Sequence, residues 1–104
     1  MLSRTYRIPT SQFPAVTRGK SFQNDLFRVV VKYDETLNNP KCAVIVSTKV
    51  AKTAVARNRI RRQVYDALGV LIKDLPVAYI SVFPKKVPLE HSEILLNLKN
   101  LLNI

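Results

Sequence analysis

Cysteine, histidine and glycine are scarce in this chain of 104 residues, and each scarcity excludes a class of site. The single cysteine, Cys42, has no second cysteine to pair with, and it begins the apolar run CAVIV, so we interpret it as a small buried side chain. His91 is the single histidine, so any zinc site or histidine-dependent triad would have to use it, and the sequence offers no second histidine to complete a ligand set. The two glycines exclude a glycine-rich phosphate loop. We therefore expect neither catalytic side chains nor a cofactor bound by the protein.

Long apolar runs and a recognisable signal peptide are also lacking. No stretch approaches the roughly 18 apolar residues of a membrane-spanning helix, so we expect no membrane partner. A lone cysteine without a signal peptide fits a reducing cytoplasm. Because 47% of the residues are hydrophobic, the composition indicates a folded chain rather than a disordered tail. The length predicts a single domain over residues 1–104.

The low number of acidic residues is the most informative feature of the composition. Seven Asp and Glu stand against 17 Lys and Arg, which gives a net charge of +10. Residues 1–62 hold 13 basic and 3 acidic residues, whereas residues 63–104 hold 4 of each. Such an asymmetry predicts a polyanionic partner, with nucleic acid as the first candidate and an anionic membrane surface as the second.

The hydrophobic pattern predicts the order helix, strand, strand, helix, strand, helix, with a further short strand possible before the second helix. The first helix is expected over residues 11–18 and the strands over residues 26–33, 42–48 and 77–83. The strand over residues 42–48 is apolar on both faces, which predicts a central place in the sheet. The last helix begins at Pro88 and carries an apolar stripe made of Ile94, Leu95, Leu98, Leu101 and Leu102. This order predicts an α+β fold, a small α–β sandwich.

Residues 54–68 predict an amphipathic helix that Thr53 caps and that extends through Lys73 if Gly69 is tolerated inside it. At about 100° per residue, one sector of this helix is apolar and faces the core. Its members are Ala56, Ile60, Val64, Ala67, Leu68 and Leu71. The opposite arc holds Asn58, Arg59, Arg61, Arg62, Tyr65 and Asp66.

Basic residues crowd the start of this helix, where stability alone would favour acids. Between residues 49 and 62 there is no acid, and the six basic residues are Lys49, Lys52, Arg57, Arg59, Arg61 and Arg62. Like charges at such spacings repel one another, and the forked guanidinium group suits phosphate. We therefore predict that the segment binds phosphate, although a solvated basic face without a specific partner is the alternative.

The segment VSTKVAKTAVARNRIRRQVYDAL resembles the signature of the protein subunit of bacterial ribonuclease P. Arg57, Asn58 and Arg59 match the Arg-Asn-Arg motif that opens a helix, after Ser47 and Lys49 in a Ser-x-Lys type element. SQFPAVTRGKSFQNDLFRVVV resembles the N-terminal pattern of this family. The strand VAYISVF and the leucine-rich last helix follow in the expected order, so the resemblance covers nearly the whole chain.

The resemblance implies a left-handed β-α-β crossover and a role in processing precursor tRNA. A catalytic RNA would remove the 5′ leader with magnesium, while the protein binds both this RNA and the leader. The implied RNA contacts are Lys49, Lys52, Arg57, Asn58, Arg59, Arg61 and Arg62. The implied leader cleft includes Phe13, Arg28 and Val30, with Val30 where the family often has an aromatic residue.

Three other readings of the sequence compete with this one. A non-catalytic structural RNA-binding protein, such as a small ribosomal component, fits the same basic α–β pattern. A DNA-binding helix-turn-helix domain is disfavoured because such domains are mainly helical and three segments here predict strands, so we expect no DNA partner. A membrane-surface helix is disfavoured because the sheet needs the apolar face of the helix.

Overall fold

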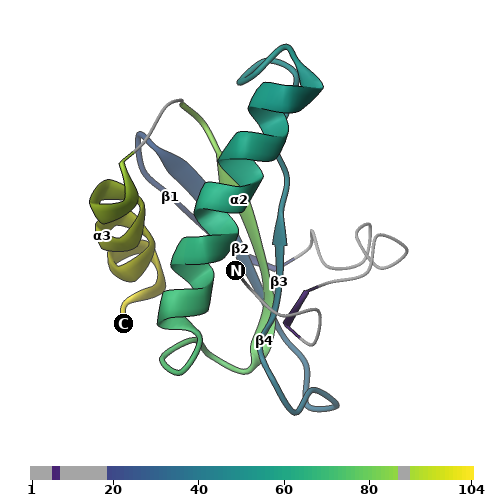
Figure 1. Cartoon of the computed structure of the whole chain (residues 1–104). Helices are drawn as coiled ribbons and strands as arrows, with labels where there is room; N and C mark the ends of the chain where they lie inside the picture. The colour runs from purple at the N-terminus through teal and green to yellow at the C-terminus, as the bar shows by residue number, and fades with distance from the viewer. Residues whose placement is uncertain (1–5, 8–18, 87–89) are drawn as a thin grey trace.

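The computed structural model describes residues 6–7, 19–86 and 90–104 (Figure 1). Its elements in chain order are β1 (Lys20–Gln23), β2 (Phe27–Tyr33), β3 (Lys41–Val44), α2 (Ala54–Leu71), β4 (Ala78–Pro84) and α3 (His91–Leu102). This order confirms the predicted α+β class and includes the additional short strand. The helix predicted over residues 11–18, with Phe13, and the predicted helix start at Pro88 lie outside the described residues.

The four strands form one sheet in the order β1-β2-β4-β3. β2 is antiparallel to both β1 and β4, whereas β3 and β4 are parallel and are connected through α2. In Figure 1, α2 lies in front of the sheet and β4 lies to the left of β3, so this connection is a left-handed crossover. Nearly all parallel crossovers are right-handed, and the unusual hand agrees with the one that the family resemblance implied.

The prediction for residues 42–48 was wrong in length and in position. β3 ends at Val44, and after Ile45 donates its N–H to the Val82 carbonyl at 2.9 Å the chain turns. In this turn the Ser47 carbonyl accepts the N–H of Ala51 at 3.2 Å. Among the described strands, β3 lies at one edge of the sheet rather than at its centre.

The edge strand is nevertheless apolar because both of its faces are buried. Cys42, Ala43 and Val44 are at most 3% exposed. Along the outer edge, Arg7 forms a parallel bridge with Cys42, and the Tyr65 hydroxyl accepts the N–H of Val44 at 3.2 Å. Burial on both faces of a strand therefore does not require a neighbouring strand on each side.

The main core lies between the sheet and the two helices, which cover the same face of the sheet (Figure 1). α2 contributes the buried residues Ile60, Val64, Ala67, Leu68 and Leu71. β2 contributes Phe27, Val29 and Val31, β4 contributes Ala78, Ile80 and Val82, and α3 contributes Ile94 and Leu98. The predicted apolar sector of α2 is thus confirmed, with Ala56 only partly buried at its start. Neither described helix is long and apolar enough to cross a membrane.

The N-terminus of α2 forms as predicted. Thr53 is the N-cap, and its side-chain oxygen accepts the N–H of Ala56 at 3.1 Å. The first turn contains no acidic residue. Gly69 lies inside the helix, which continues to Leu71. The first turn therefore combines a helix dipole and basic side chains without any carboxylate to balance them.

Candidate nucleic-acid interface

We call the basic face the set of side chains at the start of α2 and in the turn before it: Lys49, Lys52, Arg57, Asn58, Arg59, Arg61 and Arg62. Lys49, Lys52, Asn58, Arg59 and Arg62 are exposed, and Arg57 and Arg61 are half-buried. The fold therefore gathers every RNA contact implied by the sequence at the same end of α2.

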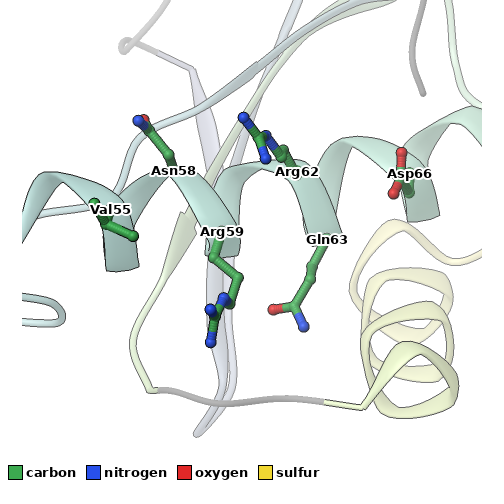
Figure 2. Close-up of a pocket in the computed structure, with 6 residues that line it drawn as sticks. All are labelled: Val55, Asn58, Arg59, Arg62, Gln63 and Asp66. Atoms are coloured by element: carbon green, nitrogen blue, oxygen red, sulfur yellow. The ribbon is translucent and has the colours of Figure 1, made fainter.

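A hollow of about 340 Å³ lies along one side of this face. Its lining residues are Val55, Asn58, Arg59, Arg62, Gln63 and Asp66 (Figure 2). Figure 2 shows Arg59 and Gln63, one helical turn apart, extending from the same side of α2. Two guanidinium groups and two carboxamides outnumber the one carboxylate here, which favours an anionic ligand with hydrogen-bond acceptors.

A second hollow of about 300 Å³ has no acidic residue among the described residues that line it. It is lined by Arg7, Asn58, Arg61, Arg62 and Tyr65. Arg61 donates from Nη2 to the Asn58 Oδ1 atom at 2.6 Å, which leaves the amide NH₂ of Asn58 as a donor. Because Asn58 and Arg62 line both hollows, they form the ridge between them.

Arg57 differs from the other arginines of the basic face because its side chain bonds to the backbone of the turn before α2. Its Nη1 atom donates to the carbonyls of Ala51 and Lys52, each at 3.0 Å. The guanidinium group therefore ties the turn that carries Lys49 and Lys52 to the start of α2. The predicted RNA contact of Arg57 stays a prediction beside this structural role.

Arg28 and Val30, the two described residues of the predicted leader cleft, lie apart from the basic face. Arg28 and Val30 alternate along β2 with Phe27 and Val29, so they point to the sheet face opposite α2 and α3. Val30 is only 1% exposed, so its side chain is not at the surface. Phe13 lies outside the described residues.

Sequence reasoning missed an aromatic residue on that face. Phe83 of β4 lies directly opposite Arg28 of β2. The guanidinium carbon of Arg28 is 5.3 Å from the centre of the Phe83 ring. The Arg28 Nε atom also donates to the Ser21 Oγ atom at 3.2 Å. The pairing of β2 with β4 creates this cation–π contact, and no local sequence pattern predicts that pairing.

Metal binding and thiol chemistry find little support in the described part of the chain. It contains no group of three or more His, Cys, Asp or Glu that could hold a metal ion. Burial raises the pKa of the Cys42 thiol to about 12, so this thiol is protonated at neutral pH and is a poor nucleophile.

The four-stranded α–β sandwich has a left-handed crossover, and clustered guanidinium groups stand at the start of its helix α2. This is a small α+β fold with the electrostatic features typical of nucleic-acid-binding domains. The ribonuclease P family model matches residues 2–104. The chain belongs to the ribonuclease P family.

Curated relatives and solved structures agree with this assignment. The chain is 39% identical over 66 residues to the ribonuclease P protein component of Rippkaea orientalis, a match that covers 59% of this chain and 52% of the relative. It thus spans about half the length of the curated relatives it matches. The RNase P protein of Staphylococcus aureus superposes with a TM-score of 0.80 at 24% identity, over 94% of this chain and 93% of that one. For the Thermotoga maritima protein the TM-score is 0.79 at 24% identity, over 92% and 94%. These structural likenesses show the fold.

Proposed function

We propose that this chain is the protein subunit of a ribonuclease P, which removes the 5′ leader of precursor tRNA by endonucleolytic cleavage. The observation that carries the proposal is the basic face, because a member of this family gathers six cationic side chains there without an acid between residues 49 and 62. Its partners are then the catalytic RNA and precursor tRNA, with no membrane or DNA partner, and its place is the cytoplasm.

In this proposal the hydrolysis belongs to the RNA subunit, which uses Mg²⁺, and the protein supplies binding. Each lysine or arginine that meets a phosphate releases condensed counterions and lowers the repulsion between RNA strands. The basic face would contact the catalytic RNA. The leader would run over the opposite side of the sheet, where the Arg28 guanidinium plane and the Phe83 ring offer stacking surfaces for unpaired bases.

A cleavage assay tests the proposal. The ribonuclease P RNA of Rippkaea orientalis is titrated with Mg²⁺ in the presence of a precursor tRNA, with and without this protein. We expect the protein to lower the Mg²⁺ concentration at half-maximal cleavage, because its cations replace part of the metal's screening. RNA binding with an unchanged Mg²⁺ requirement would instead support the structural RNA-binding alternative.

The salt dependence of RNA binding provides an independent measurement. If about six basic groups meet phosphates, the logarithm of the association constant falls with the logarithm of the salt concentration with a slope of about −4 to −5. Binding isotherms at four or five salt concentrations give this slope directly. A slope near zero would show that the arginines do not contact the RNA backbone.

A further inference from the structure

Arg7 lies far upstream of α2 in the sequence, yet it lines the same hollow as Arg61 and Arg62. Its backbone is fixed by the parallel bridge to Cys42 on the outer edge of β3. Its guanidinium carbon is 4.8 Å from the centre of the Tyr65 ring, within the range of about 6 Å for a cation–π contact. The fold thus places a cation from another segment beside the basic face of α2.

Tyr65 makes two contacts with different parts of its side chain. The hydroxyl accepts the Val44 N–H at 3.2 Å and so joins α2 to the edge of β3. The ring contacts the Arg7 guanidinium group. The hydroxyl therefore links α2 to the sheet, whereas the ring lies against the Arg7 guanidinium group.

Like charges gather around this hollow. Among the described residues that line it, three carry guanidinium groups and none carries a carboxylate, and like charges placed this close repel one another. In addition, the Nε atom of Arg61 is buried without a hydrogen-bond partner in the described structure, which is an unfavourable state for an N–H donor. A bound anion would offset the repulsion, and guanidinium groups match the geometry of phosphate.

We infer that Tyr65 is a positioning residue that holds Arg7 next to the basic face, and that Arg7 contacts a backbone phosphate of the bound RNA. The inference rests on the proposed function, because it adds a contact to the same RNA-binding surface. It extends that surface from α2 to Arg7 at the edge of β3. It also separates the two ends of one side chain, the hydroxyl for folding and the ring for RNA binding.

Four variants of the full chain test the inference: Arg7→Gln, Arg7→Lys, Tyr65→Leu and Tyr65→Phe. The probe is the ribonuclease P RNA of Rippkaea orientalis, titrated at several salt concentrations and below the melting temperature of each variant. Arg7→Gln should weaken binding about tenfold and make the salt slope shallower by about 0.7–0.9, as for the loss of one phosphate contact. Arg7→Lys should keep most of the slope because it keeps the cation.

The Tyr65 variants distinguish positioning from folding. Tyr65→Leu should reduce the salt slope as Arg7→Gln does, and the double variant should bind no more weakly than Arg7→Gln alone, because the two residues act as one unit. Tyr65→Phe should lower the melting temperature, since the Val44 N–H loses its acceptor, but should keep the wild-type slope.

Three results would overturn the inference. They are an unchanged slope for Arg7→Gln, additive losses in the double variant, and a Tyr65→Leu protein that melts earlier but binds RNA with the wild-type slope. In each of these cases the wild-type chain still binds RNA in a salt-dependent way, so the proposed function survives. A wild-type chain that shows no salt-dependent binding would instead reject the proposed function together with the inference.

Discussion

The two faces of α2 differ in their surroundings and therefore in what a substitution on each can change. On the inner face, Val64, Ala67 and Leu68 are completely buried against the sheet and α3. On the outer face, Arg59 and Arg62 are exposed and line an open hollow. Burial of apolar area stabilises the fold, whereas exposed like charges at a helix start do not.

This difference teaches how to interpret the arginines. The buried inner face and the Thr53 cap stabilise the helix, whereas the outer face carries an arrangement of charge that is unfavourable for the free protein. A residue type that stability does not favour at its position is evidence of another constraint, and the constraint we propose here is a polyanionic ligand. The comparison can be tested from both sides.

The largest expected effect is on the inner face. Leu68→Ala should lower the free energy of unfolding by about 2–5 kcal/mol, because it leaves a cavity at a completely buried site. The RNA affinity of the folded protein should stay unchanged. Urea unfolding followed by circular dichroism measures the first quantity and RNA titration the second.

Val70→Ala is the matched control for Leu68→Ala, because Val70 lies on the same helix but is 63% exposed. It should change the unfolding free energy by no more than about 0.5 kcal/mol. Equal losses for the two variants would mean that the inner face of α2 is not what holds the helix to the sheet.

The next effect is on the outer face. Arg59→Ala and Arg62→Ala should each weaken RNA binding by about 1–3 kcal/mol, as losses of charge-assisted hydrogen bonds. Their unfolding free energies should stay level or rise slightly, since each removes a cation from the N-terminal half of the helix. RNA titrations and thermal melts of the two variants provide both measurements.

Lys99→Ala removes one positive charge from the exposed side of α3, far along the chain from the basic face, and serves as the charge control. It should affect RNA binding less than either arginine variant. If all three variants bind RNA equally well, net charge and not the position of the arginines determines affinity. If the arginine variants unfold readily but bind RNA normally when folded, the cluster is structural.

Local chemistry explains what the sequence could predict. The Thr53 cap and the apolar sector of α2 follow from side-chain type and helical period, which act over a few residues. Both are confirmed. Of the two helix ends that the sequence left open, Leu68 and Lys73, neither is exact, because the helix passes through Gly69 and ends at Leu71. The basic face is likewise a local feature, because all of its residues lie within one short segment of the sequence.

Contacts between distant segments explain what the sequence could not predict. The run CAVIV indicated a central strand, but in the part of the chain that the structure describes its outer edge meets Arg7 and the Tyr65 hydroxyl and no further strand. Phe83 meets Arg28 only through the register of β2 with β4. Hydrophobic periodicity shows which faces are buried, whereas the pairing order that creates these contacts depends on the whole topology.

The smallest expected effect concerns Arg57, which both stabilises the start of α2 and belongs to the proposed RNA-binding face. Arg57→Ala should lower the unfolding free energy by about 1–2 kcal/mol, because the carbonyls of Ala51 and Lys52 lose their donor. Arg59→Ala removes the same charge from an exposed position and is the control, with no expected loss of stability. Urea unfolding of the two variants side by side gives the difference. If Arg57→Ala and Arg59→Ala are equally stable, the two hydrogen bonds of Arg57 contribute nothing to the fold, and Arg57 belongs with the outer arginines as a ligand contact alone.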